Sequence, residues 1–185
     1  MMTELSLNIL DVAENSIRAE ATLVEITVEV SVASDRLVII IADNGCGMTK
    51  EQIAQVEDPF FTTRTTRKVG LGVPFFKYAA ESTGGNFSIR SEKGEGTVVR
   101  AEFGLTHIDR MPLGDITGTL HTLVTFHPEV DFRYIYRYND AEFTLDTRQM
   151  REILGGIPLD TPEVSEYIRE YLTENKQEVD GGAVI

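Results

Sequence analysis

The hydrophobic pattern changes its period twice at the start of the chain. Between Leu5 and Ala19, apolar residues recur at the spacing of one helix face, which predicts an amphipathic helix. Between Thr22 and Val32, apolar and polar residues alternate, which predicts a strand with one buried face. Leu37 to Ala42 is continuously apolar, which predicts a strand buried on both faces. The chain therefore begins as a helix followed by two strands.

Capping residues and glycines bound the next elements. Thr49, with Gln52 three residues later, has the pattern of a capping box and predicts a short helix. Residues 58–69 have no clean period and are rich in Thr and Arg, so we expect a mobile loop. Gly70-Leu71-Gly72 then opens a helix that we expect to end near Thr83, before two glycines.

The rest of the chain continues to mix strands with helices. We expect hairpin strands at 86–92 and 97–103, a helix at 113–124, hairpin strands at 132–138 and 142–145, and helices after Asp146 and Thr161. This order predicts an α+β fold in which helices stack on one face of a mixed sheet as a two-layer α/β sandwich. We expect a first domain at 1–105, a small α+β extension at 110–175 and a flexible tail at 176–185.

Composition narrows the function. The net charge is -13, from 17 Lys and Arg against 30 Asp and Glu. Nucleic acids and anionic membranes are bound through Lys and Arg, so neither is an expected partner. The single cysteine excludes an internal disulfide, and no zinc-ligand spacing is present. No apolar run reaches the ~20 residues that cross a bilayer, and the N-terminus has no secretory pattern, so we expect a cytoplasmic protein.

Polar residues form a stripe along the first predicted helix. Asn8, Asp11, Asn15 and Arg18 are three or four residues apart, which places them on one face. Asp11 and Asn15 lie one turn apart, and their oxygens are suitable ligands for magnesium or its waters. An ordinary solvated face is the alternative interpretation of this stripe.

Two glycine-containing segments are placed to meet a ligand. Asp43 follows a buried strand, and Gly45 and Gly47 allow the backbone to approach a flat ring closely. Gly70 and Gly72 precede a helix, whose N-terminal amides attract anions. Alone, the Asp43 segment is equally consistent with a surface turn, and Gly70-Leu71-Gly72 by itself favours a plain turn into a helix.

The order and spacing of these segments resemble the GHKL (Bergerat) ATPase superfamily, which contains gyrase, Hsp90, MutL and the histidine kinases. The segments LDVAENSIRAEA, DNGCGM, DPFFTTR, VGLGV and GEGT resemble its N-box, first glycine box, F-box, second glycine box and last glycine box. The histidine-kinase ATPase domain is the most similar member. The resemblance implies that Asn15 holds Mg²⁺ and Asp43 accepts a hydrogen bond from adenine. It further implies ATP contacts from Gly45, Gly47, Met48, Gly70, Leu71, Gly72, Val73 and Thr97.

Three departures from the family pattern affect the expected activity. Asp11 stands where hydrolysing members carry a Glu, so the base position is one methylene short and we expect weak or no ATP hydrolysis. Lys68 replaces a glycine, and we expect Lys68 and Arg64 to contact the triphosphate. No helical hairpin with a phosphoacceptor histidine precedes the first helix, so we expect a stand-alone ATPase domain.

These features predict a histidine-kinase-like signalling protein that transfers phosphate to, or regulates, a separate partner, with residues 110–175 recognising it. An anti-sigma-type serine kinase and a non-catalytic ATP-gated regulatory module are the alternatives. His107 lies in a segment similar to a kinase H-box, although a linker histidine is the simpler interpretation. The segment after residue 112 also resembles stand-alone ATP-binding proteins linked to hydrogenase and NADH-oxidising subunits.

Four other residues have simpler expected roles. We expect Cys46 to pack beside the base, His121 to pack on a helix and His127 to lie in a loop. We expect Glu14 to be structural, because it points about 100° away from Asn15 around the helix.

Overall fold

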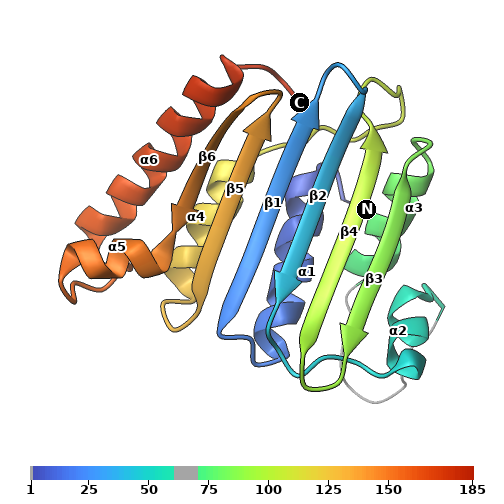
Figure 1. The fold of residues 1–185 in the computed structure, drawn as a ribbon, viewed down its shortest axis with the longest axis horizontal. Coiled ribbons are helices and arrows are strands. Elements are labelled where there is room, and N and C mark those ends of the chain that lie inside the picture. The colour runs from blue at the N-terminus through green and yellow to red at the C-terminus, as the bar shows by residue number, and fades with distance from the viewer. Residues whose placement is uncertain (1, 61–70) are drawn as a thin grey trace.

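A computed structural model describes residues 2–60 and 71–185. These residues contain a six-stranded sheet in the spatial order β3-β4-β2-β1-β5-β6 (Figure 1). The strands are β1 (Leu23–Ser31), β2 (Arg36–Asp43), β3 (Asn86–Glu92), β4 (Gly96–Gly104), β5 (Asp131–Tyr138) and β6 (Ala141–Asp146). β1 and β5 run parallel, and the other neighbouring pairs are antiparallel. The α+β class expected from the sequence is confirmed.

Helices cover one face of this sheet, which gives two layers. The helices are α1 (Leu5–Arg18), α2 (Lys50–Glu57), α3 (Gly72–Glu81), α4 (Ile116–Phe126), α5 (Thr147–Leu154) and α6 (Pro162–Asp180). α1, α3 and α4 lie behind the sheet in Figure 1, whereas α5 and α6 lie at its β6 end. Among the described helices, none combines the length and hydropathy needed for a membrane span.

The core lies between the sheet and the helices behind it. Val24, Ile26, Val28 and Val30 of β1 are buried, as their alternation predicts. Large aromatic side chains from both halves of the chain, including Phe76, join the same cluster. Each fully buried side chain of this size contributes about 1.5–3 kcal/mol to folding.

The other face of the sheet is more open than the sequence indicated. β2 was expected to be buried on both faces, but Val38, Ile40 and Ala42 are half-exposed. That prediction is wrong because the helices pack against only one face of the sheet. The open face carries cross-strand ion pairs, including Glu25–Arg133 at 2.9 Å.

The C-terminal segment extends the same sheet. β5 pairs in parallel with β1 from Leu23 opposite Asp131 to Val30 opposite Tyr138. The small α+β extension expected at 110–175 therefore shares its sheet and its core with the first hundred residues. This arrangement places the extension beside β1 rather than on a linker.

Two helix boundaries differ from the expected ones. α4 starts at Ile116 rather than Leu113, because the Asp115 carboxylate accepts a hydrogen bond from the Gly118 amide at 2.9 Å and caps the helix there. α6 continues to Asp180, so the expected tail at 176–185 begins inside a helix. Asp180 is buried and bonded to the Tyr136 hydroxyl at 2.8 Å, which fixes this end.

Candidate nucleotide site

One end of β2 brings the predicted adenine carboxylate to α1. Asp43 is the last residue of β2, and its Oδ2 accepts a hydrogen bond from Ser16 Oγ at 2.6 Å. Its Oδ1 accepts a hydrogen bond from the Gly45 amide at 2.9 Å. Each carboxylate oxygen retains an unused lone pair, and the side chain is half-buried. Asp43 is therefore held in place while it can still accept a hydrogen bond from a ligand.

Ser16 connects the two ends of the predicted site. It is adjacent to Asn15 on α1, and its hydroxyl reaches Asp43 across 27 residues of sequence. Asn15 is half-exposed, and its Oδ1 accepts a hydrogen bond from Arg18 at 3.3 Å. The Cys46 amide of the loop after Asp43 also donates a hydrogen bond to the Ala19 carbonyl at 2.8 Å, one turn beyond Asn15, so this loop lies against the end of α1 that carries Asn15.

Asp11 lies against the start of α3. A methyl group on Gly72 would come within 2.6 Å of Asp11 Oδ2, so only glycine allows this close approach. Burial raises the pKa of Asp11, Arg18 lowers it and Glu14 raises it. The contact places a carboxylate next to the amides of Leu71, Gly72 and Val73, which start α3 without a side-chain cap.

The loop after Asp43 is shaped by its neighbours in β3 and β4. Gly47 has φ +66, and a methyl group there would collide with the carbonyl oxygen of Glu92. The Met48 amide donates a hydrogen bond to Ser91 Oγ at 2.8 Å, which ties the loop to β3. Gly47 and Met48 are therefore held beside the strand end that carries Asp43.

Ser91 is a hydrogen-bond centre that the sequence pattern does not reveal. Its Oγ lies 2.8 Å from Thr97 Oγ1 and donates to the Gly96 carbonyl at 2.9 Å. Thr97 is opposite Asp43 in the β2–β4 register and opposite Ser91 in the β3–β4 register. The expected strands 86–92 and 97–103 would pair Ser91 with Val98, whereas β4 begins one residue earlier, at Gly96, and this register brings Ser91 opposite Thr97.

Asn44 holds the same loop on its other side. Its Oδ1 accepts hydrogen bonds from the amides of Thr22 and Leu23 at 2.9 and 3.0 Å, and its Nδ2 donates to Thr22 Oγ1 at 2.8 Å. The loop is thereby fastened to β1 as well as to β3.

Comparison with known proteins identifies the family of the chain. The family described as histidine kinase-, DNA gyrase B- and HSP90-like ATPases matches residues 3–107. The chain belongs to this family. The match covers the segments that carry Asp11, Asn15, Asp43 and Thr97, and it ends shortly after β4.

Sensor kinases are among the relatives of this GHKL chain. The sensor histidine kinase ZraS of Salmonella typhi is 32% identical over 98 residues, which are 52% of this chain and 20% of that protein. Sporulation kinase C of Bacillus subtilis strain 168 is 29% identical over 89 residues, 48% of this chain and 21% of that protein. The chain thus spans about a fifth of the length of these curated relatives.

A solved structure shares the fold of this GHKL chain. The Aquifex aeolicus MutL ATPase domain, which is complexed with ADP, aligns over 99% of both chains with a TM-score of 0.50 and 14% identity. The alignment includes the C-terminal segment, and it shows that the whole GHKL chain has the fold of an ATPase domain. The family that matches residues 3–107 is described as one of ATPases.

Other predicted residues of the GHKL chain lie outside this cluster or outside the described residues. Arg64, Lys68 and Gly70 lie within residues 61–70, which are outside the described residues. Most of the loop expected at 58–69 lies in the same range. Within the described residues, no group of three His, Cys, Asp or Glu side chains is arranged to hold a metal ion. Mg²⁺ typically takes one or two protein oxygens and completes its shell with phosphates and water, which suits Asp11 and Asn15.

The histidines and Cys46 have the following places. His107 follows β4 at the end of the sheet opposite Thr97, about 25 Å along the strand. His127 Nε2 lies 2.8 Å from Glu14 Oε1, which supports the structural role expected for Glu14. His121 Nε2 lies 2.8 Å from Ser165 Oγ. Cys46 is exposed in the loop after Asp43.

Proposed function

We propose that this chain binds ATP with magnesium and passes the γ-phosphate to, or regulates, a separate partner protein. The observation that carries the proposal is the geometry around Ser16. Ser16 donates a hydrogen bond to Asp43, and the Cys46 amide donates one to the Ala19 carbonyl, so the loop after Asp43 is held against the end of the helix that carries Asn15. Membership of the histidine-kinase-like ATPase family supports the same ligand.

Each residue of the proposed site has a distinct task. The Asp43 carboxylate accepts a hydrogen bond from the adenine amino group, which favours adenine over guanine. Asn15 supplies an oxygen to the magnesium ion, which neutralises phosphate charge when it is bound. The amides of Leu71, Gly72 and Val73 at the start of α3 bind phosphate oxygens. Arg64, Lys68 and Gly70 complete the phosphate contacts in this proposal.

Asp11 accounts for the proposed preference for transfer over hydrolysis. A general base must reach the attacking water, and the aspartate side chain is one methylene shorter than glutamate. Burial raises the pKa of Asp11, and its charged neighbours act in opposite directions: Arg18 lowers this pKa and Glu14 raises it. With weak activation of water, a partner side chain attacks in line and forms a bond to the γ-phosphorus. The bond to the bridging oxygen breaks, and this oxygen leaves with ADP.

Exposed apolar residues near the start of α3 support a protein partner. Phe75 and Tyr78 project from α3, with 37% and 73% of their surface exposed. They line an apolar hollow together with Met111. Such a surface next to a phosphate site is typical of a protein contact.

Incubation of the purified chain with γ-labelled ATP and magnesium tests the proposal. Label that appears on an added acceptor protein, with little release of free phosphate, is the expected result. Acid-labile label on the chain itself that His107→Ala removes would favour the H-box alternative. Label on serine of the acceptor would favour the anti-sigma type. ATP binding without any label or phosphate release would favour the non-catalytic regulatory module. Rapid phosphate release without transfer would contradict the proposal.

A further inference from the structure

The β6 end of the molecule contains a groove that the nucleotide site does not use. It lies between β6, α5 and α6 and has a volume of about 300 Å³. Leu145, Met150 and Tyr171 contribute apolar surface to it. Ile153 and Tyr167 also line it and are 84% and 53% exposed. Large apolar side chains on both sides of one groove mark an interaction surface more strongly than scattered ones do.

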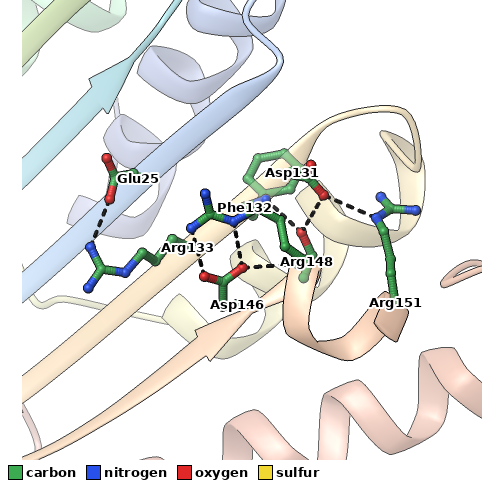
Figure 2. Close-up of polar contacts among 8 residues, drawn as sticks. Glu25, Asp131, Phe132, Arg133, Asp146, Arg148 and Arg151 are labelled. Atoms are coloured by element: carbon green, nitrogen blue, oxygen red, sulfur yellow. Dashed lines mark hydrogen bonds and ion pairs between the residues drawn. The ribbon is translucent and has the colours of Figure 1, made fainter. Parts of the chain in front are cut away.

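α5 is fastened in an orientation that leaves these apolar residues uncovered. Figure 2 shows Arg148 bonded to Asp146 and Arg151 bonded to Asp131, at 2.8 and 3.1 Å. Thr147 Oγ1 accepts a hydrogen bond from the Phe132 amide at 2.9 Å. These contacts occupy one side of α5, while Met150 and Ile153 lie on another side and line the groove. The groove is therefore formed before any partner arrives.

The edge strand beside the groove is partly blocked. The Tyr171 hydroxyl donates a hydrogen bond to the Thr144 carbonyl of β6 at 3.1 Å. A peptide that added to β6 as a further strand would have to displace this bond. The groove therefore suits side chains that project from a helix better than an added strand.

Charge selects the class of partner. Glu163 and Glu170 are four residues before and three residues after Tyr167, so they border its side chain on α6. Glu174 is three residues after Tyr171 on the same helix. All three are exposed, and the ion pairs of the described residues do not include them. A second copy of the chain would bring the same acidic row against this one and be repelled.

We propose that the α5–α6 groove docks a basic amphipathic helix of a partner protein. Apolar residues of that helix at i, i+3 or i+4 fill the groove between Ile153 and Tyr167, and its Lys or Arg residues pair with Glu163 and Glu170. The inference rests on the proposed role of the C-terminal segment in recognising a partner. It does not use the nucleotide residues, so ATP binding is a separate readout.

Fluorescence anisotropy with a model peptide tests the inference. The probe is a labelled helical peptide of about 18 residues with leucines at i, i+3, i+4 and i+7 and lysines elsewhere. A second peptide carries glutamates in place of the lysines. We expect the purified chain to bind the lysine peptide and not the glutamate peptide. We expect Ile153→Ser with Tyr167→Ala to weaken binding at least about tenfold, because both residues are anchors.

Matched variants distinguish peptide binding in the groove from attraction to the overall negative charge of the protein. Val184 is also apolar and 96% exposed, so Val184→Ser removes a similar side chain elsewhere and should leave binding unchanged. Glu163→Lys with Glu170→Lys should weaken binding, whereas Glu51→Lys with Glu81→Lys, the same charge change on exposed residues of α2 and α3, should have a much smaller effect. Circular dichroism confirms that each variant is folded.

Three results would overturn the inference. They are equal binding of both peptides, unchanged binding by the Ile153 and Tyr167 variant, and self-association of the wild-type chain that this variant abolishes. Calorimetry with ATP on the same samples distinguishes the two proposals. ATP binding without peptide binding removes the groove assignment alone, whereas peptide binding without ATP binding removes the proposed function alone.

Discussion

Two aspartates, one in each half of the chain, show how a site differs from a structural cluster. Asp43, at the end of β2, accepts two hydrogen bonds, is half-buried and keeps lone pairs free. Asp180, at the end of α6, has a fully buried side chain that accepts bonds from Tyr136, Lys176 and the Gly182 amide. A ligand can reach the half-buried Asp43, whereas the fully buried side chain of Asp180 is reached only by its own protein partners. A fixed acceptor that a ligand can reach is what distinguishes the proposed nucleotide site from a structural cluster.

Removing the buried carboxylate of Asp180 should have the largest effect on stability. Asp180→Ala leaves the Lys176 ammonium without its 2.6 Å partner and the Tyr136 hydroxyl without an acceptor. We expect a loss of about 3–5 kcal/mol in the free energy of unfolding, measured with urea. Glu178→Ala, an exposed change on the same helix, is the control and should alter stability by less than about 0.5 kcal/mol. A small effect of Asp180→Ala would remove the contrast between the two carboxylates.

Gly47→Ala, in the loop after β2, should have the second largest effect on stability. A side chain at φ +66 costs about 1–3 kcal/mol, and its methyl group would also collide with the Glu92 carbonyl. Gly84→Ala is a matched control, because Gly84 has φ +70 but open space around it. We expect Gly84→Ala to show the strain alone and Gly47→Ala to lose more stability and weaken ATP binding. Equal losses in stability would show that the loop is not held against β3.

Ser91→Ala tests the hydrogen-bond centre beside Thr97. The Met48 amide and the Gly96 carbonyl each lose a partner, and we expect about 1 kcal/mol of destabilisation in urea unfolding. We also expect weaker ATP binding, because the loop that carries Gly47 is released. Ser88→Ala, on β3 but further from the loop, should leave ATP binding unchanged. Unaltered binding by Ser91→Ala would mean that this network is only structural.

The smallest expected effect is a difference in how Asp11 and Asp146 make stability depend on pH. Burial raises the pKa of Asp11, so folding favours its protonated form and stability falls as pH rises through the window above 3.8. The Arg148 hydrogen bond lowers the pKa of Asp146, so its contribution is present above 3.8 and is lost as pH falls below it. Urea unfolding from pH 3 to pH 7 should show that Asp11→Asn raises stability at neutral pH and Asp146→Asn lowers it. Shifts of the same sign would contradict this account.

Much of the local structure around the proposed nucleotide site could be predicted because its residues lie in locally recognisable segments. The capping box at Thr49 and the end of β2 at Asp43 follow from short-range patterns, and both are confirmed. Ser91 was missed because a serine in an alternating strand looks like any solvent-facing residue until the two strands are paired.

The C-terminal half was less predictable because its decisive contacts are distant in sequence. The hydrogen bond from Tyr136 to Asp180 spans 44 residues, and the parallel pairing of β5 with β1 joins Leu23 to Asp131. No local period reports either contact. The same limitation made β2 appear buried on both faces, since an apolar run does not reveal whether a second layer exists.

Isothermal titration calorimetry of ATP, with and without magnesium, tests the central claim that Asp43 and Asn15 bind one nucleotide. The wild-type chain should bind ATP in a magnesium-dependent manner. Asp43→Asn should weaken binding at least about tenfold, since a hydrogen bond to a charged group contributes about 1.5–3 kcal/mol. Asn15→Ala should reduce the magnesium dependence, and Asp140→Asn, an exposed change in the β5–β6 turn, should bind as the wild type does. Unchanged affinity and magnesium dependence in both site variants would contradict the account.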